Sequence, residues 1–229
     1  MPILKNINLD IKAGETIALV GPTGSGKSTI AKLITRFYDP QEGSILIDGV
    51  DIRTLSFQSL RSNIAVVPQE PFLFYDTVRA NLAFSRPNIR DEEILSACKL
   101  MDIETLINKQ KDGLDTLIGE RGGSLSGGEK QLFALARAFI SNPHILILDE
   151  ATSNIDLSSE AKVEQALDIL LKGRTSIIIA HRLSTALRAD RIVFVQDGCI
   201  LESGTHQELL EVNGAYTAFF KTWQKQQKN

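Results

Sequence analysis

The feature that most constrains this chain is a glycine-rich stretch at residues 21–29, which reads GPTGSGKST. It completes the pattern G-x-x-x-x-G-K-[ST], in which a loop holds phosphate groups between a strand and a helix. Residues 16–20 predict the buried strand before it, and apolar residues recur at helical spacing after it. The predicted phosphate-loop residues are Gly21, Pro22, Thr23, Gly24, Ser25, Gly26, Lys27, Ser28 and Thr29.

The residue types of this loop suit a nucleoside triphosphate bound with Mg²⁺. Glycines allow the backbone N–H groups to turn toward an anion, and the start of the following helix adds the positive end of its dipole. In such a loop Lys27 reaches the β- and γ-phosphates, and the Ser28 hydroxyl ligates Mg²⁺.

Strand-like and helix-like patterns alternate along the chain, which predicts an α/β fold with a mostly parallel sheet. Further strands are expected at residues 44–47, 64–67, 145–148, 176–180 and 191–195. Several of these are continuous apolar runs, typical of strands buried on both faces. Asp197 and Gly198 separate two β-prone runs and predict a hairpin, so the last strands should form an antiparallel edge.

Strand signals disappear between residues 71 and 142, where helical patterns cover residues 91–106 and continue again from residue 126. We therefore expect a sheet core formed by residues 1–70 and 143–220, with an inserted α-helical subdomain at 71–142. The Lys- and Gln-rich residues 221–229 are expected to form a polar, solvated C-terminal tail.

Composition excludes several classes of protein. The net charge of −3 lacks the basic excess of a nucleic-acid-binding domain. Cys98 and Cys199 are far apart and are interpreted as reduced packing residues. No apolar run approaches the roughly 20 residues of a membrane helix, so any membrane association must come through another segment or subunit.

Two acids follow the apolar run at residues 145–148, at the strand end where open parallel sheets bind ligands. Asp149 is suited to hold Mg²⁺ through its water shell. Glu150 could orient or deprotonate an attacking water. The alternative is a pair of solvated acids in a loop, which the phosphate loop in the same chain disfavours.

Residues 125–129, LSGGE, precede a helix with one apolar stripe. Ser126 and Glu129 satisfy a capping box, so structural capping alone explains them. It does not explain Gly127 and Gly128, which bare the helix start and let a phosphate approach its N–H groups. A single chain with one phosphate loop does not need a second helix start that binds phosphate, but a dimer would use one.

Two further polar residues follow predicted strands at the same sheet edge. His181 ends the strand at 176–180, and Gln69 follows the strand at 64–67. His181 could act in catalysis, although a single histidine there is more often structural. The amide of Gln69 could meet a metal or a water, although many strand ends carry Gln without a role.

These elements, in this order, resemble the nucleotide-binding domain of the ATP-binding cassette (ABC) family over residues 3–220. Residues 21–28 match its Walker A loop, Gln69 its Q-loop, residues 125–129 its signature motif, and residues 145–149 its Walker B strand. Glu150 matches the catalytic glutamate, residues 153–156 the D-loop with Asp156, and His181 the switch histidine. Residues 120–122, 37–40 and 46–49 resemble the exporter branch.

The resemblance implies a P-loop NTPase (RecA-like) core that hydrolyses ATP with Mg²⁺ and drives export. Lys27, Gln69, Glu150 and His181 would be the catalytic residues, and Ser28, Gln69 and Asp149 the metal-binding ones. Ser126, Gly127, Gly128 and Asp156 would meet nucleotide in a head-to-tail pair. The implied partners are a second nucleotide-binding domain, identical or different, and a transmembrane domain, which places the chain at the cytoplasmic face of the cell membrane.

Three departures from the family pattern qualify these expectations. Glu129 stands where the family usually has Gln, and Asn154 replaces a small D-loop residue. The chain also starts after the point where the family carries an aromatic residue that stacks on adenine, so we expect an N-terminally truncated piece.

Other functions stay open. A regulatory, low-turnover cassette of a heterodimeric exporter would use the same fold. An ABC ATPase without a transport role would also use it, but the exporter-like residues 120–122 disfavour that function. A guanine-nucleotide switch is disfavoured because residues 108–111, NKQK, lack the Asp of the guanine-reading tetrad.

Overall fold

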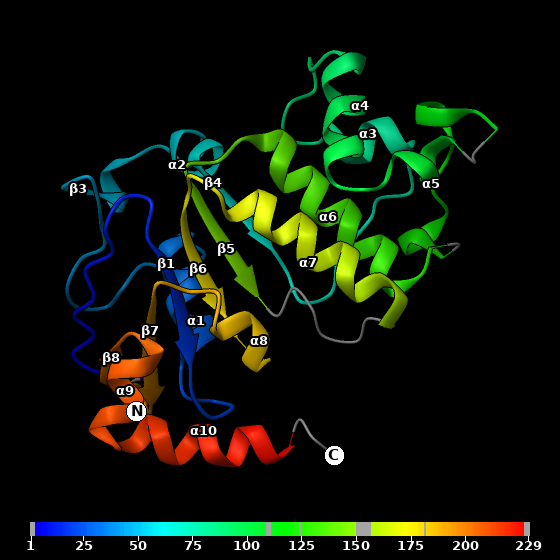
Figure 1. Cartoon of the computed structure of the whole chain (residues 1–229). Coiled ribbons are helices and arrows are strands. Elements are labelled where there is room, and N and C mark those ends of the chain that lie inside the picture. Colours follow the sequence, from blue (N-terminus) through cyan, green and yellow to red (C-terminus); the bar gives the residue numbers. More distant parts are fainter. Residues whose placement is uncertain (1–2, 109–110, 124, 150–156, 181, 227–229) are drawn as a thin grey trace.

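A six-stranded sheet organises the computed structural model, which describes residues 3–108, 111–123, 125–149, 157–180 and 182–226 (Figure 1). The strand order is β4-β5-β6-β1-β7-β8. The first five strands run parallel, and β8 is antiparallel to β7, as the predicted hairpin requires. The strands are β1 (Thr16–Val20), β4 (Ile64–Val67), β5 (Ile145–Asp149), β6 (Thr175–Ile179), β7 (Arg191–Gln196) and β8 (Cys199–Gly204).

The expected strand at residues 44–47 is shorter and lies outside this sheet. It forms only as β2 (Leu46–Ile47), which pairs with β3 (Val50–Asp51) in a separate antiparallel ribbon. A short 3₁₀ turn, η1 (Ile52–Thr54), follows it.

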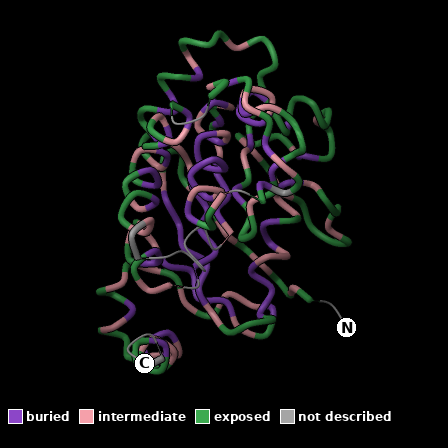
Figure 2. Tube along the Cα trace, turned by 90° about the vertical axis from the view of Figure 1, so that its right-hand side faces the viewer, coloured by how far each residue is buried: buried purple, intermediate pink, exposed green. Residues whose placement is uncertain are grey.

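Successive residues of β1 point to opposite faces of the sheet, and each face has its own core. Ile17 and Leu19 pack with the face covered by α1 (Lys27–Ile34) and α2 (Phe57–Asn63). Ala18 and Val20 pack with the face covered by α6 (Gly127–Ser141) and α7 (Leu157–Leu171). Figure 2 shows that buried residues gather in the centre of the molecule and exposed ones on its outside. The sheet is therefore covered on both faces, as predicted for its continuous apolar runs.

Helices occupy the chain between β4 and β5 and lie together at one side of the sheet (Figure 1). The predicted helix at 91–106 is interrupted, because Asp102 has φ 55° and the buried Met101 and Ile103 turn inward beside it. The boundaries of a subdomain at 71 and 142 stay a prediction. The helical elements here are α3 (Val78–Leu82), α4 (Asp91–Leu100), α5 (Glu104–Asn108), η2 (Gly113–Asp115), η3 (Glu120–Gly122) and α6.

The C-terminal part corrects one expectation. After α8 (Leu183–Ala186) and α9 (His206–Val212), helix α10 (Ala215–Gln226) continues through most of the predicted tail. Trp223 is only 8% exposed, and its ring centroid lies 5.5 Å from that of Phe219. Residues four apart share a helix face, so this apolar pair fixes the helix that the polar composition concealed.

Both cysteines are free, as expected of packing residues. Burial raises the pKa of the Cys98 thiol to about 12, which keeps it protonated and unreactive at neutral pH. Among the described residues, no helix is both long enough and apolar enough to cross a membrane.

Candidate nucleotide-binding site

The predicted phosphate loop joins the carboxyl end of β1 to α1, in the centre of the parallel sheet. Gly21 has φ 151°, and a Cβ placed on it would lie 1.9 Å from the Val195 carbonyl oxygen of β7. Gly26, at φ 106°, is the N-cap of α1 and supplies no side-chain hydrogen bond to that helix. The loop is therefore pressed against β7, and its helix start has no side-chain cap that would compete with an anion.

Lys27 is folded back into this loop. Its Nζ donates to the carbonyl oxygens of Gly21 and Pro22, each at 2.8 Å, and to Ser25 Oγ at 3.4 Å. The residue is only 4% exposed. An ammonium group that is buried needs oxygen partners, so the loop holds a positive charge at its centre where the phosphates are expected.

The close contact of Gly21 predicts the effect of one methyl group. Gly21→Ala should abolish measurable nucleotide binding and lower the melting temperature, because its Cβ meets backbone that cannot rotate away. The measurement is titration of a fluorescent ATP analogue, with thermal unfolding in parallel.

Gly173→Ala is the matched control. Gly173 also has positive φ, 74°, but a Cβ there meets nothing within 4 Å, and it lies before the start of β6, at the sheet edge opposite the phosphate loop. The substitution should cost about 1 kcal/mol of conformational strain and leave nucleotide binding intact. Equal losses in both variants would contradict the role given to the Val195 contact.

The described metal-site candidates all lie at the carboxyl edge of the sheet. Ser28 is the second residue of α1 and is partly buried. Asp149 is the last residue of β5 and is also partly buried, whereas Gln69 is exposed two residues beyond β4. Strands β4 and β5 are neighbours, and β6 alone separates β5 from β1. Parallel strands thus bring Gln69, Asp149 and the loop to one edge, with donor groups of the oxygen type that Mg²⁺ prefers.

Three predicted site residues, Glu150, Asp156 and His181, lie outside the described residues. Their roles stay predictions from the sequence.

The second glycine pair begins α6. Ser126 Oγ accepts from Glu129 N at 3.2 Å, and Glu129 Oε2 accepts from Ser126 N at 2.8 Å, which is the predicted capping box. The box does not use the N–H groups of Gly127 and Gly128, of which Gly127 is exposed and Gly128 buried. In Figure 1 the start of α6 lies well apart from the loop between β1 and α1. One chain therefore does not bring these two glycine-rich elements together.

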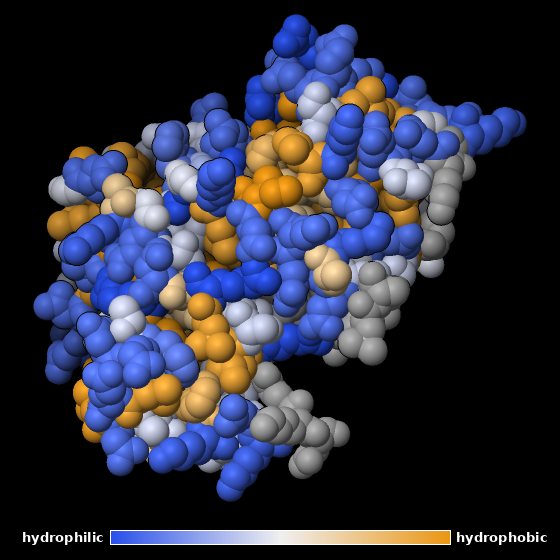
Figure 3. All heavy atoms as spheres, in the orientation of Figure 1, coloured by the Kyte–Doolittle hydropathy of each residue, from blue (hydrophilic) through white to orange (hydrophobic). Residues whose placement is uncertain are grey.

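Two surface hollows lie away from the phosphate loop. One, of about 410 Å³, is lined by residues of α4 and the end of α6, including Leu100, Phe139 and Ile140. Figure 3 shows apolar side chains gathered in that part of the surface. The other, of about 460 Å³, lies beside the starts of β1 and β7, near Glu15 and Arg191. No predicted nucleotide-contacting residue lines either hollow.

Sequence reasoning missed the support that β7 and β8 give to the loop. The Val195 carbonyl packs on Gly21, and Gly198 N donates to Ser25 O at 3.2 Å. The turn at Gly198 was recognisable, but its contact with the loop depends on strand order. The nearby N-terminal segment joins the same turn, where Lys5 N donates to Gly198 O at 2.8 Å.

A strand, a phosphate-binding loop and a helix at the centre of a mostly parallel sheet define a P-loop NTPase fold. The family model described as ABC transporter matches residues 4–153, and the chain belongs to this family. It corresponds to the ATP-binding domain, which implies nucleotide binding.

The relatives point to the exporters within the family. The chain is 52% identical over 215 residues to a multidrug export ATP-binding/permease protein of Staphylococcus aureus, and 51% identical to an uncharacterized ABC transporter ATP-binding protein of Bacillus subtilis. Each alignment covers 94% of this chain and 37% of the relative. The structure of a bacterial Atm1-family ABC exporter with ATP bound matches with TM-score 0.89 and 43% identity, over 96% of this chain and 38% of that one. These exporter homologues imply ATPase activity for the domain, and the chain spans little more than a third of their length.

Proposed function

We propose that this chain is the ATP-hydrolysing motor of an exporter and works by ATP-dependent, head-to-tail pairing of two such domains. The observation that carries the proposal is the separation of two glycine-rich elements in one chain. The phosphate loop encloses Lys27, whereas Gly127 and Gly128 begin α6 elsewhere. A second domain, turned head to tail, would supply the missing half of each site.

Each side chain has a defined task in this proposal. Lys27 exchanges its loop carbonyls for phosphate oxygens, and the loop N–H groups stabilise charge on the transferred phosphoryl group. Glu150 positions the attacking water, and His181 bonds to the γ-phosphate. Mg²⁺, held by Ser28, Gln69 and Asp149, would neutralise charge on the phosphates.

The additional length of the relatives supports a membrane partner. The relatives are named as ATP-binding/permease proteins, and nearly two thirds of their length lies outside the match. Exposed aromatic side chains, including Phe72, Tyr75 and Phe84, lie on the helical side of the chain. Such a surface is suited to a protein partner. A transmembrane domain is the partner that the names of the relatives favour, and it would place this chain at the cytoplasmic face of the membrane.

Pairing is testable on the chain as it stands. Light scattering should give a mass near 25.2 kDa without nucleotide and about twice that with MgATP. Ser126→Arg should bind nucleotide normally and fail to pair, because it blocks the start of α6 with a bulky cation. A mass that stays monomeric under saturating MgATP, or pairing that survives in Ser126→Arg, would argue against the head-to-tail arrangement.

A regulatory, low-turnover cassette is the second candidate, and one observation favours it. The Glu129 carboxylate bonds to the backbone at the start of α6, so a negative charge already occupies the end expected to meet the partner's phosphates. Like charges would weaken closure, although the partial exposure of Glu129 limits the effect. The two candidates differ in turnover rate, which is measured by phosphate release from the wild type and from Glu150→Gln.

A further inference from the structure

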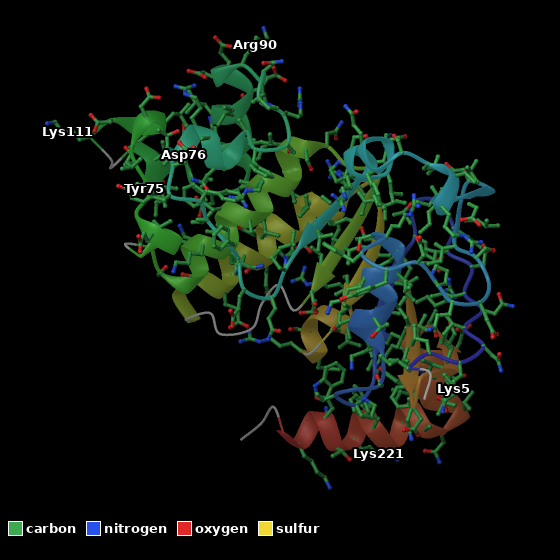
Figure 4. All side chains as sticks on the ribbon, turned by 180° about the vertical axis from the view of Figure 1, so that it is seen from behind. Lys5, Tyr75, Asp76, Arg90, Lys111 and Lys221 are labelled. Atoms are coloured by element: carbon green, nitrogen blue, oxygen red, sulfur yellow. The ribbon has the colours of Figure 1, made fainter. Side chains whose placement is uncertain are left out.

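The segment at residues 71–77, which follows Gln69 and leads into α3, presents aromatic side chains to solvent. Phe72 is 52% exposed and Tyr75 65% exposed. The Phe74 ring lies 5.1 Å from Phe72 and 4.8 Å from Phe84, measured between centroids. Figure 4 shows Tyr75 and Asp76 at the outer margin of the molecule. The end of the segment is held by an isolated antiparallel bridge between Thr77 and Leu117, where Ile118 N donates to Asp76 O at 2.9 Å. Before that bridge the segment belongs to no helix or sheet, so its shape there depends on side-chain contacts.

One buried side chain holds the inner side of the segment. Asn81 of α3 is completely buried. Its Oδ1 accepts from Phe74 N at 2.8 Å, and its Nδ2 donates to the carbonyl oxygens of Phe74 and Thr77, each at 3.0 Å. The amide thereby gives the segment the hydrogen bonds that a neighbouring strand would supply.

Arg137 of α6 completes this support from a different element. It donates from Nε to Asn81 O at 2.8 Å, from one terminal nitrogen to Phe72 O at 3.0 Å, and from the other to Asn81 Oδ1 at 3.0 Å. Its guanidinium also lies 5.6 Å from the Phe74 ring centroid. All three acceptors are neutral.

The chemistry of Arg137 goes beyond simple packing. Burial lowers its pKa, and within the described ranges it makes no ion pair that would offset the desolvation of its charge. What the site uses is the planar fork, whose donors reach three acceptors in fixed directions. Lysine cannot reproduce this geometry, because its ammonium is a single point.

We propose that Arg137 is a positioning residue that couples the segment at 71–77 to the start of α6. Arg137 lies about 15 Å along α6 from Gly127, since each residue of an α-helix rises about 1.5 Å. A helix is rigid over that length, so the placement of the segment and of Ser126–Gly128 become linked. The role in turnover rests on the proposed function, whereas the physical link does not.

Amide hydrogen exchange of the whole chain tests the link without nucleotide. Arg137→Lys should raise exchange about tenfold or more in peptides covering both 71–77 and 125–131, because it loses charge-assisted hydrogen bonds. A peptide covering β1 and the start of α1 should not change. Arg137→Gln, which keeps a planar donor group without the charge, should give the same pattern and serves if the lysine variant folds poorly.

Arg174→Lys is the matched control. Arg174 also donates to carbonyl oxygens, of Pro143 and Leu170, and lies 5.5 Å from the Phe139 ring centroid. It does not contact the segment at 71–77, so both test peptides should exchange as in the wild type. Exchange that rises only in 71–77, rises equally in all peptides, or rises equally in the control overturns the coupling.

A second readout connects the link to turnover. Arg137→Lys should keep its affinity for a fluorescent ATP analogue within about twofold while the maximal hydrolysis rate falls about tenfold, a separation expected when only the closed state is affected. Unchanged hydrolysis in Arg137→Lys would overturn the role in turnover. A wild type that neither pairs nor hydrolyses ATP would instead count against the proposed function, and the exchange result would still decide the link.

Discussion

Lys27→Met is expected to reduce the affinity for MgATP by about 100-fold or more and to bring hydrolysis to background. The ammonium now donates to the Gly21 and Pro22 carbonyls at 2.8 Å, and we expect it to donate to phosphate oxygens when nucleotide binds. A hydrogen bond between charged groups contributes about 1.5–3 kcal/mol, so losing two predicts a loss of at least this size. The measurement is calorimetric titration with MgATP, followed by steady-state hydrolysis.

The same helix provides the control for Lys27. Lys32 lies five residues further along α1 and is exposed. Lys32→Met removes an equal charge from the same element and should leave affinity unchanged within about twofold, because exposed charges are screened by solvent. If Lys27→Met binds MgATP as tightly as Lys32→Met, the loop is not the phosphate site.

The strands were predictable because consecutive apolar residues indicate a strand that is buried on both faces. Residues 145–148 and 191–195 read as doubly buried strands, and they are β5 and β7. The hairpin at Gly198 followed from its turn residues. For these strands and this hairpin, the local sequence pattern agrees with the burial in the folded protein, so one amino-acid sequence is enough to infer them.

Elements fixed by distant contacts were not predictable in the same way. Apolar residues continue at helical spacing across Met101 and Ile103. The local sequence therefore does not predict that the helix ends at Asp102, between α4 and α5. The Lys and Gln of α10 concealed the pairing of Phe219 with Trp223.

The same division holds for the candidate site. Lys27 and Ser28 could be identified because their spacing from the glycines is itself the chemical requirement. The contact of the Val195 carbonyl with Gly21 could not, because it requires β7 to lie beside β1 although many residues separate them. The role of Arg137 could not be predicted either, because two of its three acceptors are backbone carbonyls, which any sequence would carry.

Glu150→Gln is expected to lower ATP hydrolysis by about 100-fold or more while the ATP-dependent pair accumulates. Glu150 directly follows Asp149, the last residue of β5, in the sequence. The proposed function assigns the metal to Asp149 and the attacking water to Glu150. An amide keeps the size of the carboxylate but cannot accept a proton, so closure should survive and turnover should not.

The measurement combines phosphate release with light scattering in MgATP. Glu92→Gln, an exposed acid on α4, should change neither readout and controls for the loss of one negative charge. Fast ATP hydrolysis by the wild type, together with a Glu150→Gln variant that pairs but does not hydrolyse ATP, would support the ATP-hydrolysing motor. A wild type already as slow as Glu150→Gln would favour the regulatory cassette, in which the Glu129 carboxylate at the start of α6 opposes closure on the partner's nucleotide. Hydrolysis that continues at the wild-type rate in Glu150→Gln would remove this glutamate from the reaction and leave the water to be positioned by another group at the same sheet edge.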